Sequence, residues 1–436
     1  MLRRFVTAAA VYALCLSPEA VAAQTTLSGQ MHDFFVQSVV LSTTPGGGGV
    51  VAHTPLFTTD PTVKATTDLI DQISQQIGSQ VSILPLGSSS GGFTYGYNAA
   101  LGTFSRTTET FGPAFAERAV TIGKGKFAFG MNYEHSNYNS LDGKDIGNGD
   151  IKFNLLHQKL TPPSFVEGDV IQSSILMKLK SDTAVFLVNF GVTDKLDVGF
   201  AVPVVHVSMD LTYHATILDF ATHTVSPNTH LFANGTKTAD FNTTGSASGV
   251  GDVVVRGKYK LFDSGKGGIA AGVDLRLPSG DEANMLGSGA TQTQLFFIGS
   301  GVSGSASPHI NIGYTFSTGG NSPSNQVNYV GGTEVRVNPK MTVMGDLIGR
   351  TLRNSLRLSD VSVPHTYQQG AAAPIEQTTL QTIALSPGSL TSALAAVGVK
   401  VNPWRNLLIS AHLLFPLNDS GLRSGVTPVV GFDYSF

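Results

Sequence analysis

Beyond Ala119 the chain consists of segments in which apolar and polar residues alternate one by one. One segment has the apolar residues Phe127, Phe129, Met131 and Tyr133, each followed by a small or polar residue. The same alternation returns at 253–261, 269–277 and 310–316. Because successive side chains of a β-strand point to opposite faces of a sheet, this period of two predicts amphipathic strands. The sequence therefore predicts an all-β fold over residues 119–436.

The alternating segments and the turn residues between them predict about fourteen strands. We place them near 125–140, 149–160, 168–180, 183–193, 195–218, 247–262, 267–279, 290–303, 306–318, 325–337, 341–354, 376–401, 406–417 and 425–436. Short connections follow the even-numbered strands, whereas longer ones, near 219–246, 280–289 and 355–375, follow odd-numbered strands. An even strand number with short turns on one side is typical of transmembrane antiparallel β-barrels.

Two positions interrupt this regular pattern. Residues 376–401 form one strand only if Ser386-Pro387-Gly388 is a bulge, because a turn there would make the strand number odd. At Val204-Val205 the apolar positions shift by one residue, which predicts a β-bulge.

Composition favours a barrel wall over a soluble sandwich, which would show the same alternation. Charged residues make up 13% of the chain, against about 25% in an ordinary soluble domain. No apolar run beyond the N-terminus is long enough for a spanning helix. The last strand ends on Phe436, which resembles the signal read by the machinery that inserts outer-membrane barrels. We therefore expect the bacterial outer membrane as the location, with its lipid and that machinery as partners.

The N-terminal residues 1–23 have the layout of a secretory signal peptide, with Arg3 and Arg4, an apolar stretch and a small-residue site at Ala23. Its removal also removes Cys15, the only cysteine, so disulfides and thiolate ligands are excluded from the mature chain. Two of the 27 basic and one of the 30 acidic side chains lie in this segment, which leaves a formal charge of −4. This charge indicates no nucleic-acid partner.

Residues 24–118 lack the alternation and form a separate region. Apolar residues at helical spacing predict a helix over Thr62–Ile77, and a hairpin-like stretch follows Gly92. With both ends of the barrel in the periplasm, this region starts there. It either folds into the lumen as a plug or forms a loosely ordered periplasmic extension, and its apolar groups, which need cover, favour the plug.

No motif points to an enzyme. Gly87 to Gly91 match the pattern G-x-S-x-G around Ser89, but a Gly/Ser-rich stretch surrounds them instead of the strand and helix that a nucleophile elbow requires. The eleven histidines show no ligand spacing. We expect no catalytic residue, no metal and no cofactor.

Charged residues on the lumen-facing side of the strands are the candidate site. They are Arg256, Lys258, Lys260, Asp274, Arg276, Glu334 and Arg336, together with Glu134. They form either an ordinary polar lining or partners for the plug, through Glu117 and Arg118. Their mixed signs favour salt bridges over an ion-selective ring.

Several segments resemble the outer-membrane transporters named for the meta-pathway of phenol degradation, a family similar in architecture to long-chain fatty-acid channels. They are FGPAFAERAVTIGKGKFAFG (111–130), SGVGDVVVRGKYKLF (248–262), DLRLPSGDE (274–282) and the ending GFDYSF. The resemblance implies passive, plug-gated uptake of a small hydrophobic, and also aromatic, solute. The alternative is a structural or surface-binding barrel whose external loops carry the activity and through which no solute passes.

Overall fold

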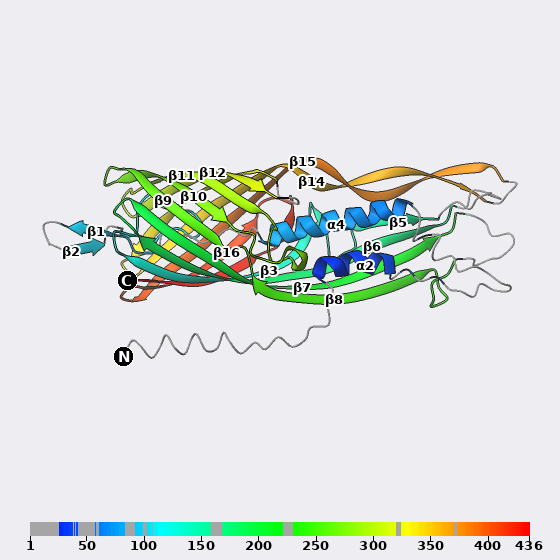
Figure 1. Cartoon of the computed structure of the whole chain (residues 1–436), viewed down its shortest axis with the longest axis horizontal. Coiled ribbons are helices and arrows are strands. Elements are labelled where there is room, and N and C mark those ends of the chain that lie inside the picture. The colour runs from blue at the N-terminus through cyan, green and yellow to red at the C-terminus, as the bar shows by residue number, and fades with distance from the viewer. Residues whose placement is uncertain are drawn as a thin grey trace.

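Twelve strands form one closed antiparallel ring in the computed structural model of the chain (Figure 1). The structure describes residues 26–37, 39, 41, 57, 61–82, 92–98, 103–106, 108–157, 168–220, 230–319, 324–369 and 373–436. The ring strands are β3 (Phe127–Leu141), β6 (Val170–Gly191), β7 (Leu196–Leu218), β9 (Val254–Asp263), β10 (Gly267–Arg276), β11 (Thr291–Gly301), β12 (Ala306–Thr318), β13 (Gln326–Asn338), β14 (Met341–Gln368), β15 (Ile375–Trp404), β16 (Leu407–Pro416) and β18 (Thr427–Ser435). The predicted all-β barrel is confirmed.

The predicted number of fourteen strands is wrong by two, for two different reasons. The residues placed in separate strands at 168–180 and 183–193 form the single strand β6. Strand β5 (Ile151–Leu156) pairs only with β6 and lies outside the ring. The number stays even, because β15 runs without a turn through Ser386-Pro387-Gly388 and the irregularity lies in its partner β14, between Leu352 and Ser355.

Shorter elements complete the described chain. They are the helices α2 (Leu27–Gln37) and α4 (Pro61–Ser82), the 3-10 helix η2 (Glu282–Asn284), and the strands β1 (Tyr95–Asn98), β2 (Thr103–Arg106), β4 (Lys144–Asp145), β8 (Thr238–Val250) and β17 (Leu422–Ser424). None of the helices in the described ranges is both long and apolar enough to cross a membrane.

The part of the ring nearer the C-terminus presents apolar side chains outward. Residues such as Phe297, Ile310, Leu347 and Val430 are 52–64% exposed, while their strand neighbours point to a polar lumen. Such an apolar band suits contact with lipid tails. The closed ring leaves no strand edge with unpaired backbone groups inside the membrane. The end that carries the C-terminus has the short turns and is therefore periplasmic (Figure 1).

The opposite, extracellular end reverses this pattern. On β7, Phe200 and Val204 point outward and are 47% and 42% exposed, whereas Val205, Val207 and Met209 point inward and are buried. The register between β6 and β7 is continuous here, so the predicted bulge at Val204-Val205 is wrong. The apolar positions shift because β7 leaves the lipid: above this level its inner face is apolar and its outer face meets water.

The inward apolar surface of this extracellular part covers the two helices. Ile70, Ile73 and Ile77 of α4 and Met31 of α2 are buried in one cluster with Tyr213 and other residues of β5, β6 and β7. The predicted helix is thus confirmed. Figure 1 shows α2 and α4 beside these strands, next to the long β14–β15 hairpin. The first described residues therefore lie at the extracellular end and not, as expected, at the periplasmic end.

Other described residues that precede the barrel lie at the periplasmic end. The β1–β2 hairpin projects from that end (Figure 1). Residues 108–122 then run across the lumen without regular secondary structure, and β3 follows. We call residues 108–122 the crossing segment.

Candidate functional site

An ion network joins the crossing segment to the barrel wall. Glu117 accepts a hydrogen bond from Arg256 on β9 at 2.6 Å and lies 3.3 Å from the ammonium of Lys258. Arg256 also donates two hydrogen bonds, of 2.6 and 2.5 Å, to the carboxylate of Asp274 on β10. Arg256 and Asp274 face each other in the β9–β10 register. Lys258 has a second carboxylate, Asp197, at 3.5 Å.

A second buried contact lies across the lumen on β13. Arg118 is 3.8 Å from the carboxylate of Glu334, and both side chains are buried. The hydroxyl of Thr110 donates to the same carboxylate at 3.2 Å. Buried charges are costly unless they are paired and hydrogen-bonded, so these pairs fix the segment in one position.

Wall side chains also satisfy the backbone of the crossing segment. The Glu117 N–H donates to Asn311 Oδ1 at 2.6 Å, and the Asn311 amide donates back to the Glu117 carbonyl at 3.0 Å. The N–H groups of Phe115 and Ala119 donate to Asp346 and Ser300. A segment without a helix or strand needs such partners when it is buried. The polar lumen face supplies them.

The predicted site residues separate into three groups. Arg256, Lys258, Asp274 and Glu334 contact Glu117 or Arg118 directly or through one another, as the pairing hypothesis requires. Arg276 and Glu134 line a cavity above the segment. Lys260 instead pairs with Asp263 in the periplasmic turn, and Arg336 pairs with Glu109, both in exposed positions.

Several site residues were missed from the sequence. They are Asp197, Asn311, Asp346, Arg350, Lys400, Arg423 and Gln80. Most of them follow the alternation of apolar and polar residues in their strands, so the sequence could have predicted that their side chains face the lumen. Gln80 lies on a helix and Arg423 on a three-residue strand, where the alternation gives no signal.

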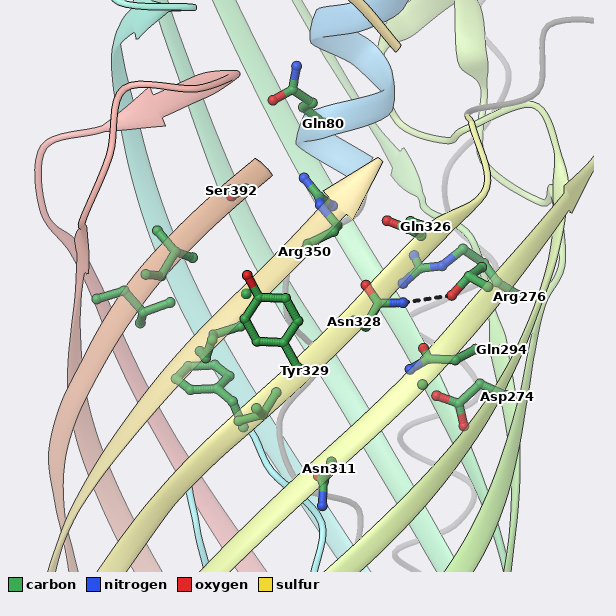
Figure 2. Close-up of a pocket in the computed structure, with 18 of the residues that line it drawn as sticks. Gln80, Asp274, Arg276, Gln294, Asn311, Gln326, Asn328, Tyr329, Arg350 and Ser392 are labelled. Atoms are coloured by element: carbon green, nitrogen blue, oxygen red, sulfur yellow. Dashed lines mark hydrogen bonds between the residues drawn. The ribbon is translucent and has the colours of Figure 1, made fainter. Parts of the chain in front are cut away.

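A cavity of about 220 Å³ lies in the lumen on the extracellular side of the crossing segment. Figure 2 shows polar side chains of β10 to β13 on one side of it, among them Asp274, Gln294, Asn311 and Asn328. Asn328 donates to Thr315 at 2.8 Å. Gln80 hangs over the cavity from α4 (Figure 2). The other side is apolar and contains Phe115, Ile348, Leu394 and Leu414, which pack in one cluster.

Phe115 forms part of the floor of this cavity. It also lines a smaller hollow of about 10 Å³ on the periplasmic side, together with Asn132, Lys400, His412 and Asp433. Its ring meets His412 edge-on at 6.0 Å between centroids. Phe115 therefore separates two spaces that lie one above the other along the lumen.

The structure also bears on metal binding and on the G-x-S-x-G match. The described ranges contain no group of three histidine, cysteine or carboxylate side chains able to hold a metal ion. Ser89, the candidate nucleophile, lies outside the described residues, as does the expected signal peptide.

One known protein family resembles part of the chain. A family model described as "Putative MetA-pathway of phenol degradation" matches residues 179–352. The predicted family resemblance is confirmed. The chain is an outer-membrane β-barrel, because its closed antiparallel ring carries a lipid-facing apolar band. No curated protein matches it.

Three solved structures are similar to this chain. An outer-membrane channel from Pseudomonas putida F1 has 11% identity and a TM-score of 0.43, over 73% of this barrel's chain and 98% of that chain. A FadL homologue from Pseudomonas aeruginosa has 9% identity and a TM-score of 0.32, over 73% and 91%. A mutant of the monoaromatic hydrocarbon channel TodX has 12% identity and a TM-score of 0.25, over 73% and 93%.

Proposed function

We propose that this barrel is a channel for passive, plug-gated uptake of small hydrophobic molecules, aromatic ones included, across the outer membrane. The observation that carries the proposal is that the lumen contains two cavities, one on each side of Phe115. We call the cavity of about 220 Å³ on the extracellular side of the crossing segment the upper cavity. A permeant enters it from the extracellular end and reaches the periplasm when the crossing segment moves. The family description, with its reference to phenol degradation, supports an aromatic solute.

The crossing segment acts as the plug in this proposal. Its polar anchors are concentrated at Glu117 and Arg118, whereas Phe115 contacts the apolar side of the cavity. A shift of the segment would exchange a few specific contacts and leave the ring intact, because the ring strands pair with one another and not with the plug. No step needs a catalytic residue or a bound cofactor.

We also propose that the insertion machinery of the outer membrane recognises the last strand. The N–H of Phe436 donates to the Phe127 carbonyl at 2.8 Å, and the two rings lie 5.7 Å apart. The C-terminal residue thus meets the first residue of β3 at the seam where the ring closes.

The test is solute-driven swelling of liposomes that contain the refolded barrel, with neutral single-ring solutes. Wild type should swell slowly, and Phe115→Ala should swell several-fold faster because the two hollows merge. The matched control is Phe316→Ala, which removes a ring of the same size from the lipid face. Equal, absent swelling for all three proteins would reject the channel.

The structural or surface-binding alternative rests on one feature, the β14–β15 hairpin. Its paired part extends from Ser355 to Gln368 and from Ile375 to Gly388, beyond the other strands (Figure 1). Shortening this hairpin should leave solute flux unchanged if the barrel is a channel. Loss of binding to cells or surfaces with no flux in either form would favour the alternative.

A further inference from the structure

Three arginines approach the upper cavity from different elements. Arg276 belongs to β10, Arg350 to β14 and Arg423 to β17, and all three line the cavity. Figure 2 shows Arg276 and Arg350 pointing into it from β10 and β14, which are separated by β11 to β13. Arg350 stands opposite Ser392 in the β14–β15 register, and Arg423 donates to the Ser392 hydroxyl at 2.7 Å.

The carboxylates that line the cavity accept their hydrogen bonds from groups other than Arg276 and Arg423. The lining contains four arginines and three carboxylates. Two of the carboxylates, Glu117 and Asp274, are held by Arg256. The third, Glu134, accepts a hydrogen bond from Ser136 at 3.3 Å.

The contacts of Arg276 and Arg423 are with neutral groups. Arg276 donates to the Ser82 carbonyl at the end of α4, at 3.0 Å. Arg423 donates to Ser392 and to Asn418 Oδ1. Within the described chain, neither guanidinium forms an ion pair. The upper cavity therefore offers the guanidinium groups of Arg276 and Arg423 to a ligand.

Buried hydrogen-bond donors at the same cavity also lack acceptors. Among protein atoms of the described ranges, Gln80 Nε2, Gln292 Nε2 and Arg423 Nε have no partner. Their residues are 8%, 3% and 6% exposed. The Gln80 amide cannot simply be turned over, because its oxygen accepts the Leu422 N–H at 2.6 Å. Buried donors of this kind are rare and call for an acceptor.

We propose that the permeant held in this cavity is a small organic monoanion, a carboxylate on a single ring or a short apolar body. This inference rests on the proposed channel function and names its substrate class. The carboxylate oxygens meet Arg276, Arg350, Arg423 and the unpaired amides, while the apolar body lies against Ile348, Leu394 and Leu414. A cavity of about 150 Å³ already holds benzene, so the 220 Å³ found here fits one ring with its carboxylate.

A neutral hydrocarbon fits this site less well. It would displace water from the unpaired donors without replacing the acceptor. Charge-assisted hydrogen bonds to a carboxylate are roughly twice as strong as neutral ones, and guanidinium groups match its geometry. The cavity therefore selects the anion over a neutral molecule of equal size.

The test compares benzoate with benzamide, a neutral molecule of nearly the same shape, by equilibrium dialysis against the detergent-solubilised barrel at pH 7.5. Wild type should bind benzoate about tenfold to hundredfold more tightly, the range expected for one or two charged hydrogen bonds. Arg350→Gln and Arg423→Gln should each lower benzoate affinity at least tenfold and leave benzamide within twofold. Heat-modifiable migration on gels verifies that each variant is folded.

The control is Lys260→Gln, which removes a cation outside the cavity. It should leave both affinities unchanged. Equal binding of benzoate and benzamide to wild type, or an equal loss in Lys260→Gln, would overturn the inference. Swelling with neutral solutes measures the channel separately, so the anion preference can fail while the channel function stands, and the reverse.

Discussion

The substitution Glu117→Gln separates the plug from the wall without disturbing the wall itself. Glu117 belongs to the crossing segment and contacts the two wall cations Arg256 and Lys258. When its charge is removed, Arg256 keeps both hydrogen bonds to Asp274, and Lys258 keeps Asp197 at 3.5 Å. No wall charge is left without a partner.

The expected magnitude follows from this geometry. Breaking a buried ion pair usually costs about 3–5 kcal/mol, much of it because one charge stays buried alone. Here both cations remain compensated and glutamine still offers an oxygen, so we expect about 2–3 kcal/mol. Since 1.4 kcal/mol corresponds to a factor of ten, the released state of the segment should become about 30- to 150-fold more populated.

Amide hydrogen exchange of the refolded barrel measures this population. Peptides that cover residues 110–122 contain the N–H groups of Glu117 and Ala119, which are protected by Asn311 and Ser300. Their exchange should accelerate by the same factor in Glu117→Gln. Peptides from β12 and β16 should not change. In planar bilayers, openings should become more frequent by a comparable factor.

The matched control is Glu109→Gln on the same segment. Glu109 lies 2.7 Å from Arg336, but its side chain is 64% exposed, and exposed pairs contribute only about 0.2–1 kcal/mol. Exchange should therefore rise by no more than about fivefold. If Glu117→Gln behaves like Glu109→Gln, the backbone hydrogen bonds hold the plug and the ion network does not.

Two further predictions concern stability. Leu347→Arg places a charge on the lipid face, where Leu347 is 60% exposed, and a urea titration in lipid vesicles should show a loss of about 2–4 kcal/mol, the cost of a cation near the bilayer midplane. Asp240→Arg on the outward face of β8 removes only the exposed contact with His214, so the same titration should show a loss of no more than about 1 kcal/mol. Equal effects would contradict the assigned membrane boundary. Ile73→Ala empties a buried position between α4 and the extracellular strands and should cost about 2–5 kcal/mol of helix docking; limited proteolysis should then cut within 61–82, and unchanged protection would refute the packing role of this face.

The sequence predicted the barrel well because the alternation is a direct consequence of its two environments. Residues such as Ile310 and Ile312 must face lipid, and Asn311 between them must face the lumen. One of the two errors in the strand number arose where the environment changes along a strand, and the other because β5 lies outside the ring. At Ser181 to Thr183 of β6 the outer face passes from water to lipid, so the pattern breaks although the strand continues.

The candidate site was predicted in part, for a similar reason. Arg256, Asp274 and Glu334 stand at lumen-facing positions of regular strands, and their pairing with Glu117 and Arg118 was a hypothesis from charge alone. The upper cavity was not predicted. Gln80 and Leu422 are 342 positions apart and meet only because α4 enters the extracellular mouth.

The sequence by itself determined the all-β class, the two faces of each strand and the expectation of an outer-membrane wall, because burial in lipid imposes a period of two on every strand. Only the tertiary structure decided that twelve strands close the ring, that the helices sit at the extracellular end, and that Arg276, Arg350 and Arg423 share one cavity. These facts depend on strand register and ring closure, which join residues far apart in the chain. No local pattern encodes such contacts.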